Sequence, residues 1–313
     1  MPPHHPVLDP AAAYPKITEL RSLLDARDWA AARALLDAAE PVERDSLIRS
    51  GAEAGGREEF LRGVLDADPA DSAAAAMLGQ HLIVEAWKIR TGYRASHVSP
   101  EQFAAFHDLL RRAEIMLIGA TARTPGDPAL WTTRITTARG LELGQSEARR
   151  RYDRLAEVAP HHLPAQRQLL QQLCPKWSGS WERAHAFARE AAGAVPPGAH
   201  NAVLIAEVHL EHWLDLQSPG NLTYLRMDPA RSEVYDAARR SVWHPEFRRT
   251  HGWVGVMNTF AAVFALLDDM PAVGSLFTAL GDLGCEWPWE YIGDPVTVIS
   301  QYRNRALPAG VPA

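Results

Sequence analysis

Helix-forming segments separated by proline and glycine limit most strongly what this chain can fold into. Stretches of about 10–20 residues rich in alanine, leucine, arginine, glutamate and glutamine alternate with short proline- or glycine-containing connections. The one strand-like run, residues 296–300 (VTVIS), follows Asp294 and Pro295. Because aspartate followed by proline suits the cap and first turn of a helix, this run is also predicted to be helical. The sequence therefore predicts an all-α fold.

Two consecutive stretches, residues 127–160 and 163–196, match each other when one is shifted by 36 residues (163 − 127 = 36). Each stretch reads as a helix, a short turn, a second helix and a proline that begins the next unit. The matching positions are Pro128 and Pro164, Ala148 and Ala184, Ala156 and Ala192, and Pro160 and Pro196. Proline fits a first helical turn because its missing N–H has no partner there in any case. The pattern indicates repeated helical hairpins.

The second helix of each hairpin has a small alanine followed by an aromatic residue, Tyr152 or Phe187, and then by the closing proline. This spacing resembles the tetratricopeptide repeat, whose period is about 34 residues. The tryptophan and glycine of that repeat's first helix are displaced or missing here, so the repeats are degenerate. Looser matches occur at residues 28–41, 231–245 and 268–284. The resemblance implies a tetratricopeptide-like right-handed α-solenoid of about five or six hairpins.

A wider resemblance depends on two segments, CPKWSGSW (174–181) and residues 258–291. Together they are similar to a bacterial family of helical-repeat proteins of unknown function, which carries a P-x-W-G-G-S-type loop between repeat helices. The similarity covers roughly residues 70–292, and Ser178 stands where that loop has its first glycine. It supports the fold class and implies no chemistry. The domain prediction is a flexible leader over residues 1–15, one helical-repeat domain over 16–305 and a flexible tail over 306–313.

The loop CPKWSGSW is predicted to connect the two helices of one hairpin. Pro175 should end the first helix, Gly179 should adopt a backbone conformation that other residues avoid, and Ser180 should cap the second helix. Its two tryptophans have two interpretations. They fill a widened hairpin, or Trp177 and the neighbouring Lys176 form an aromatic floor with a cation at its rim. Trp181 is expected to be the more structural of the two.

Polar residues on the first helices of the hairpins indicate a lined groove, because those helices line the concave face in tetratricopeptide-like arrays. A solvated stripe or a buried, hydrogen-bonded histidine is the simpler interpretation of each position. Stacked in register, the stripes would bind a peptide segment or a small molecule through polar anchors on an apolar wall. The predicted ligand-binding residues are His81, Glu85, Lys88, Arg134, Lys176, Trp177, His209, His212, His251 and Asn258.

Metal binding, catalysis and a purely structural role as the partner of a neighbouring protein are the alternatives to this binding role. His209 and His212 form an HxxH pair, but a cation needs a third ligand that the sequence does not supply at a fixed spacing, so no metal or cofactor is predicted. Glu207, Glu211 and Asp215 are read as a separate, solvated acidic stripe. No hydrolase, phosphate-binding or dinucleotide-binding motif is present. An enzyme acting on a small metabolite stays possible if His81, Glu85 and His209 converge as acid–base groups.

Charge and cysteine content exclude several classes of partner. The net charge of −6 comes from acidic and basic residues mixed along the chain, which is unlike the basic surface of a nucleic-acid-binding protein. Cys174 and Cys285 are far apart and outside any CxxC motif, which favours a reducing cytoplasm. No apolar run reaches the ~18–20 residues that span a membrane. The sequence leaves the ligand and the oligomeric state open.

Overall fold

The computed structural model describes residues 5–91, 97–216 and 221–307, and the secondary structure there is helical apart from one isolated bridge between Val7 and Leu283. The prediction of an all-α fold is therefore confirmed. The strand-like run 296–300 lies inside helix α16 (Pro295–Ala306), and the Asp294 side chain caps that helix at the Thr297 N–H. Within the described ranges, no helix combines the length and apolar character needed to cross a membrane.

The chain forms two compact units, which are described separately. The N-terminal unit comprises residues 16–179, and the C-terminal unit comprises residues 180–313 together with residues 1–15. The division falls inside the loop CPKWSGSW. Compact units are not in themselves independent domains, so the single domain over residues 16–305 stays a prediction. The predicted tail over 306–313 lies, from residue 308 on, outside the described residues.

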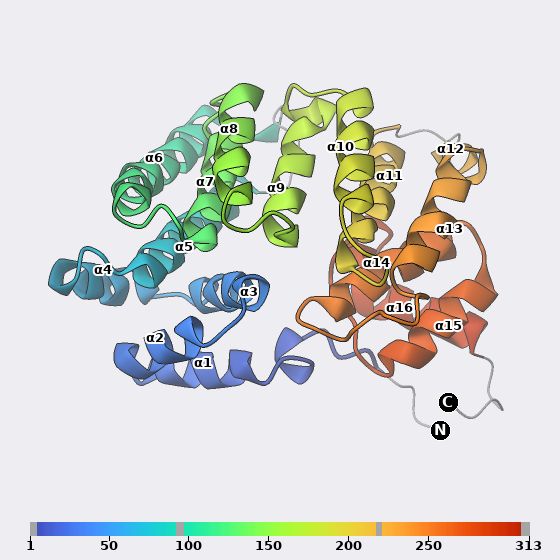
Figure 1. The fold of residues 1–313 in the computed structure, drawn as a ribbon, viewed down its shortest axis with the longest axis horizontal. Coiled ribbons are helices and arrows are strands. Elements are labelled where there is room, and N and C mark those ends of the chain that lie inside the picture. Colours follow the sequence, from blue (N-terminus) through green and yellow to red (C-terminus); the bar gives the residue numbers. More distant parts are fainter. Residues whose placement is uncertain (1–4, 92–96, 217–220, 308–313) are drawn as a thin grey trace. The chain divides into compact units, whose positions relative to one another are not determined.

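Helices of the N-terminal unit pack mainly against their neighbours in sequence (Figure 1). The longest two, α5 and α6, run along each other, and a Cβ on Gly79 would lie 2.9 Å from the Leu117 side chain, so a glycine is needed at this approach. The helices are α1 (Lys16–Asp25), α2 (Trp29–Asp37), α3 (Pro41–Ala52), α4 (Arg57–Ala67), α5 (Ser72–Arg90), α6 (Pro100–Arg123), α7 (Pro128–Gly140), α8 (Gln145–Ala156), α9 (Leu163–Leu173) and the short 3-10 helix η3 (Pro175–Trp177).

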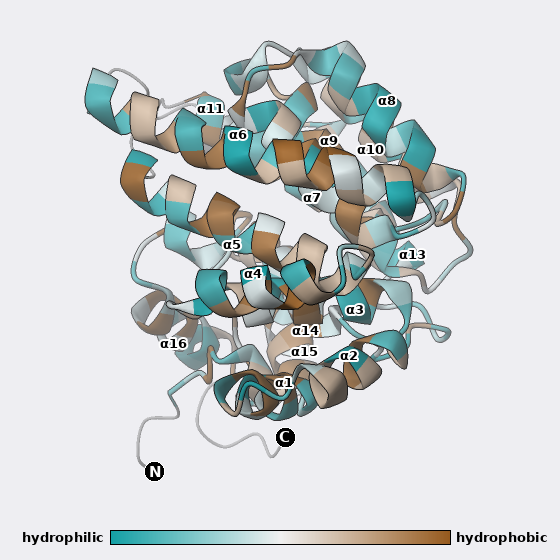
Figure 2. Cartoon of the chain, turned by 90° about the vertical axis from the view of Figure 1, so that its left-hand side faces the viewer, coloured by the Kyte–Doolittle hydropathy of each residue, from teal (hydrophilic) through white to brown (hydrophobic). Residues whose placement is uncertain are grey.

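Helix α6 carries hydrophilic and hydrophobic residues side by side on the face seen in Figure 2. Its start follows the sequence rules, because Ser99 and Gln102 form the predicted capping box. Its buried side includes Phe106 and Leu110, which pack with Ile83 and Ala86 of α5. Ile115 and Ile118 are exposed on the same helix. The buried side of α6 is therefore apolar, and its outer side carries both polar and apolar residues.

A buried carboxylate connects α6, α7 and α8. Glu114 accepts hydrogen bonds from Arg134 Nη2 and Arg151 Nη2, both at 2.8 Å, and from the Thr137 hydroxyl. Arg134 also donates to the Thr121 hydroxyl at 2.9 Å. All of these side chains are buried. Two guanidinium groups and one carboxylate thus hold three helices together in the interior of the N-terminal unit.

The predicted small-residue positions in the second helices are buried where two helices meet. Ala148 of α8 is fully buried, and α8 packs against both α7 and α9. Tyr152, one turn further along α8, is also buried. In the C-terminal unit, Ala184 and Phe187 of α10 (Trp181–Gly193) are buried in the same relation. The alanine permits close helix packing and the aromatic side chain fills the adjoining space.

Asp45 of α3 is a second buried acid in the N-terminal unit. Burial raises its pKa, against the lowering influence of His162, Arg49 and its hydrogen bond with Thr132. A carboxyl group whose folded-state pKa lies above its unfolded value binds more protons in the folded state. Folding stability is therefore lost as pH rises through the window between the two values.

The variant Asp45→Asn tests this assignment. Its amide stays neutral, so we expect the variant to be more stable than the wild type at pH 7 and equally stable below pH ~3.8, the unfolded pKa of aspartate. Urea denaturation at several pH values measures the difference. A gap that is constant over pH, or one that widens as pH falls, would contradict a raised pKa.

Helices of the C-terminal unit surround α14, whose side chains are almost all buried. Its buried Asn258 accepts a hydrogen bond from the indole N–H of Trp289 at 2.8 Å, and Trp289 is fully buried. The elements are η1 (Pro10–Ala12), α10 (Trp181–Gly193), η4 (His200–Ala202), α11 (Val203–Asp215), α12 (Asn221–Arg226), α13 (Ala230–Arg240), α14 (Trp253–Leu266), α15 (Met270–Leu280), η5 (Trp289–Tyr291) and α16 (Pro295–Ala306).

Residues 5–15, which the sequence predicts to be part of a flexible leader, make specific contacts in the C-terminal unit. Val7 donates to the Asp282 carbonyl at 2.7 Å and accepts from the Gly284 N–H at 2.9 Å. The Tyr14 hydroxyl accepts from the backbone N–H groups of Gly252 and Val254 at 3.1 and 3.2 Å, at the start of α14. These backbone hydrogen bonds depend on distant residues, so no local sequence pattern indicates them.

The loop CPKWSGSW follows the predicted course with one exchange of roles. Ser178 has a φ of 66°, in the left-handed region where the related loop has glycine. Gly179 is required for space, because a Cβ there would lie 1.9 Å from the Leu173 carbonyl oxygen. The prediction that Gly179 supplies an unusual backbone conformation is therefore corrected to a close approach between backbones. Ser180 caps α10 as predicted, by accepting from the Arg183 N–H at 3.3 Å.

Candidate functional site

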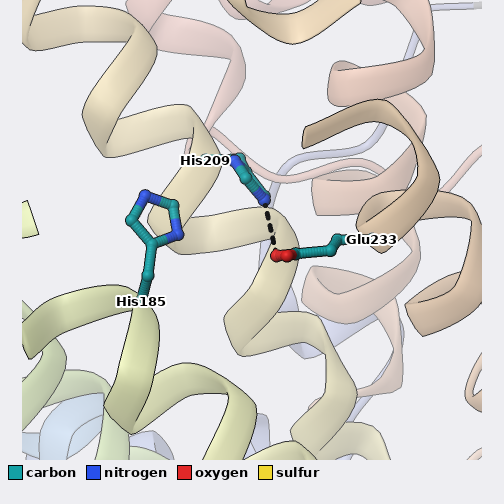
Figure 3. Close-up of side chains that lie close together, drawn as sticks. All are labelled: His185, His209 and Glu233. Atoms are coloured by element: carbon teal, nitrogen blue, oxygen red, sulfur yellow. Dashed lines mark hydrogen bonds and ion pairs between the residues drawn. The ribbon is translucent and has the colours of Figure 1, made fainter. Parts of the chain in front are cut away.

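Five polar side chains from four helices converge in the C-terminal unit. They are His185 of α10, His209 and His212 of α11, Tyr224 of α12 and Glu233 of α13. We call this group the histidine cluster. Figure 3 shows three of its members, His185, His209 and Glu233, with their side chains turned toward a common point.

Helix α11 is the centre of this arrangement, since it packs against α10, α12 and α13. His209 and His212 are three residues apart, which places them on neighbouring positions of one helix face. Glu233 lies in the first turn of α13, which follows the short α12 that carries Tyr224. Ser180 fixes the start of α10 and thereby the position of His185 one turn further on.

His209 is held on both sides of its ring. Its Nδ1 lies 2.6 Å from the Tyr224 hydroxyl, and its Nε2 lies 3.2 Å from Glu233 Oε2. The side chain is buried, so both contacts form away from bulk water. Arg189 also donates to Glu233, from Nη2 to Oε1 at 2.9 Å. A carboxylate, an imidazole and a phenol are thus linked in one chain of hydrogen bonds.

His185 approaches this chain from α10. Its Nε2 lies 3.1 Å from His212 Nδ1 and 3.3 Å from the Tyr224 hydroxyl. Among the residues that the structure describes, its Nδ1 is buried and has no hydrogen-bond partner. In Figure 3 this nitrogen, the one bonded to Cγ, is on the side of the ring toward Glu233. A buried nitrogen without a partner is rare in folded proteins and is often explained by a missing ligand.

Trp181 covers the outer side of the cluster. Its indole ring stacks on the His212 imidazole, with ring centroids 4.4 Å apart and an angle of 5° between the planes. The indole N–H donates to Asp215 at 3.2 Å. Trp181, His212 and Tyr224 are only half-buried, and the Glu233 side chain is 24% exposed. The cluster is therefore reachable from solvent on this side.

Burial and neighbouring charges set the protonation states of the cluster. Burial, assisted by His209, His212 and Arg189, lowers the pKa of His185 to about 3, and burial also lowers the pKa of His212. The hydrogen bond with His209, followed by the one with Arg189, lowers the pKa of Glu233 to about 2. Burial and the charge of Glu233 raise the pKa of Tyr224 well above its usual value. At neutral pH the cluster thus contains neutral His185 and His212 imidazoles, an ionised carboxylate and a protonated phenol.

The ten predicted ligand-binding residues are divided between the two units, with six in the N-terminal unit. Of these six, His81 is buried with Nδ1 2.9 Å from the Ala52 carbonyl, and Arg134 belongs to the Glu114 network. Glu85 and Lys88 pair with each other at 2.7 Å at the surface of α5. Burial and internal hydrogen bonds thus account for His81 and Arg134, which the sequence assigned to a groove.

The other two, Lys176 and Trp177, lie in η3. Lys176 is exposed, and Trp177 is half-buried. The Trp177 ring meets Trp87 edge to face with centroids 6.0 Å apart, and the Arg139 guanidinium lies over it at 5.8 Å. These contacts are the packing that the first interpretation of the tryptophans predicts.

Four predicted residues lie in the C-terminal unit, and two of them, His209 and His212, belong to the histidine cluster. His251 stacks on Tyr14 with ring centroids 4.1 Å apart. Asn258 is fully buried and bonded to Trp289 and to the Val254 carbonyl. The single groove through all ten residues stays a prediction.

Sequence reasoning missed His185, Tyr224 and Glu233, and it misread the acidic residues of α11. Glu207 and Glu211 are 4% and 3% exposed, so the prediction of a solvated acidic stripe is wrong for both. The reason is that α11 is covered by other helices on nearly all sides. The side chains that meet the HxxH pair come from other helices, at positions that packing alone determines. Trp181, expected to be mainly structural, contacts the cluster directly.

Comparison with known proteins adds no relative to this picture. No protein-family model matches the chain, and no curated protein matches it either.

Proposed function

We propose that this protein is a tetratricopeptide-like helical-repeat protein that binds a small molecule or a peptide segment, and that the histidine cluster is its binding centre. The solenoid part of this proposal is supported by the packing of consecutive helices, such as α7, α8 and α9, and by the buried alanine–aromatic pairs of α8 and α10. The α-solenoid architecture commonly presents concave binding surfaces.

The observation that carries the proposal is the convergence of five polar side chains at a partly exposed position lined by an aromatic ring. Hydrogen-bond donors and acceptors of different kinds lie within one small region, and His185 Nδ1 is left without a partner in the described structure. The Trp181 ring beside them offers an apolar contact. A few convergent polar groups next to an aromatic surface are typical of a ligand site.

An enzyme acting on a small metabolite is the alternative, and one observation favours it. Glu233, His209 and Tyr224 form a continuous chain in which a carboxylate orients an imidazole and the imidazole contacts a phenol. The Tyr224 phenol is protonated at neutral pH and would donate a hydrogen bond to a reacting oxygen, although its raised pKa makes it a weak acid. Tyr224→Phe removes that proton, so it would abolish catalysis while leaving most binding contacts in place.

A fragment screen observed through the ¹⁵N signals of the histidine side chains tests the binding centre. We expect fragments that carry a carboxylate, hydroxyl or amide group to shift the signals of His185 and His212. Trp181→Ala should weaken their binding about threefold to tenfold, because it removes one stacking surface. Trp243→Ala in the same unit is the matched control and should leave fragment affinity unchanged.

Two results would overturn the proposal. One is a set of binding fragments that shift only histidines outside the cluster. The other is an equal loss of fragment affinity at the cluster in Trp181→Ala and in Trp243→Ala.

A further inference from the structure

Three atoms of the histidine cluster lie at distances that suit a metal ion. One ligand atom each from His185, His209 and Glu233 lies within 4.8 Å of the other two. Ligands bonded to zinc at about 2.0–2.1 Å in a tetrahedron are about 3.3 Å apart. The separation of His209 Nε2 and Glu233 Oε2, 3.2 Å, already meets this requirement. The third atom, on His185, lies within 4.8 Å of these two, so its ring must move closer to complete a tetrahedral set.

The hydrogen bonds around these atoms orient lone pairs toward the same point. A neutral His185 that donates from Nε2 to His212 Nδ1 keeps a lone pair on Nδ1, the nitrogen that has no partner among the described residues. A neutral His209 that donates from Nδ1 to the Tyr224 oxygen keeps a lone pair on Nε2. Metal-binding histidines usually donate their second N–H to such a neighbour, which fixes the ring. His212 and Tyr224 are therefore in the right places to orient the two histidines.

The charge of the cluster also suits a cation. Glu233 supplies a carboxylate and the two histidines supply imidazole nitrogens, which together are a usual donor set for a divalent cation. His209 Nε2 lies 3.2 Å from the carboxylate, so metal binding requires the tautomer with its proton on Nδ1 in place of one with a proton between Nε2 and Glu233.

We infer that His185, His209 and Glu233 bind a divalent transition-metal ion of the zinc type, with Tyr224 and His212 as positioning residues. Two imidazoles and one carboxylate are the donor set of three-ligand zinc sites, and the same set binds iron(II) and cobalt(II). Three protein ligands leave at least one coordination position open. The neighbouring Trp181 and Tyr224 are half-buried, so an exogenous oxygen or nitrogen ligand can approach this side of the cluster.

The inference goes beyond the proposed function, because the metal site depends on three ligand atoms and not on an organic ligand. The two also differ in their sensitivity to Trp181, which contacts His212 but is not a metal ligand. Trp181→Ala should weaken fragment binding more than zinc binding, because its ring stacks on His212 and supplies no ligand atom.

Calorimetric titration of the full-length, tag-free and chelator-treated protein with ZnCl₂ tests the site. We expect one zinc ion per chain, and a loss of affinity of more than 100-fold in Glu233→Gln or His185→Gln. Tyr224→Phe should weaken binding by roughly 10-fold to 100-fold, the usual effect of removing a positioning hydrogen bond. The matched control is the double variant in which His4 and His5, neighbours in the sequence, are replaced by glutamine. This variant should have the zinc affinity of the wild type.

Cobalt absorption provides a readout that does not depend on calorimetry. Co²⁺ bound to two imidazoles and a carboxylate should give visible d–d bands, and Glu233→Gln should shift or abolish them while its circular dichroism stays like that of the wild type. The inference is overturned if the wild type binds no zinc, or if MgCl₂ competes equally with ZnCl₂. It is also overturned if zinc binding survives Glu233→Gln and His185→Gln and is lost in the His4 and His5 double variant. Fragment binding without zinc binding would refute the metal site alone, and zinc binding without fragment binding would refute the proposed organic ligand alone.

Discussion

Glu114→Gln is expected to lower the free energy of unfolding by about 3–5 kcal/mol. The wild-type carboxylate accepts hydrogen bonds from two buried guanidinium groups, Arg134 and Arg151. Glutamine removes the negative charge and leaves Arg134 in the interior with only the Thr121 hydroxyl as a hydrogen-bond acceptor for Nη1. An uncompensated buried charge is costly, whereas the net contribution of the intact ion pair is small. Urea denaturation followed by circular dichroism measures the change.

The matched control for this variant is Glu157→Gln. Glu157 pairs with Arg154 at 3.4 Å on the surface, with both side chains more than half exposed. Because exposed ion pairs contribute about 0–1 kcal/mol, we expect almost no effect. Equal losses in the two variants would mean that the Glu114 network is solvated and that Arg134 is available to a ligand after all.

Gly179→Ala is expected to destabilise the protein by about 3 kcal/mol, at the upper end of overpacking costs. A Cβ at this position would lie 1.9 Å from the Leu173 carbonyl oxygen and 2.3 Å from its carbonyl carbon. Both atoms belong to the backbone at the end of α9, so relief requires the whole loop to move. We also expect this variant to lose the edge-to-face contact between Trp177 and Trp87, which near-ultraviolet circular dichroism reports.

Gly63→Ala in α4 is the control in the same unit. It lies inside a helix, and a Cβ there would meet nothing within 4 Å. Alanine is the better helix former by about 1 kcal/mol, so this variant should be slightly more stable than the wild type. If Gly179→Ala behaves like Gly63→Ala, then the close approach of the two backbones does not exist.

Local sequence rules were sufficient for the helices and their ends. Asp294, Ser99 and Ser180 cap helices as predicted, because an N-cap depends only on residues within one turn. The left-handed conformation of Ser178 was not predicted. No local rule indicates whether a glycine such as Gly179 is required for space or for an unusual backbone conformation.

Polar residues on the inner helices could not be assigned from the sequence. The sequence predicts that the polar stripes of these helices face solvent or a groove. In the structure, α7, α11 and α14 are covered on nearly all sides. Arg134, Glu211 and Asn258 therefore face other helices. Periodicity indicates which residues share a face and does not indicate what covers it.

The histidine cluster could not be predicted from the sequence for a related reason. His185 and Glu233 are each 24 residues from His209 in the sequence (209 − 185 and 233 − 209), on different helices. Only the packing of α10 and α13 on the unit's α11 brings one atom of each within 4.8 Å of the others. The HxxH pair on α11 was the one available signal, and it indicated the right helix without its partners.

The most direct test of the histidine cluster as a metal-binding centre is a crystal structure of the zinc-treated protein, with anomalous data collected at the zinc absorption edge. We expect one anomalous peak in the C-terminal unit, about 2.0–2.2 Å from a nitrogen of His185, a nitrogen of His209 and an oxygen of Glu233. A map in which these three side chains are far apart, or in which the zinc peaks lie only at other histidines, would contradict the account.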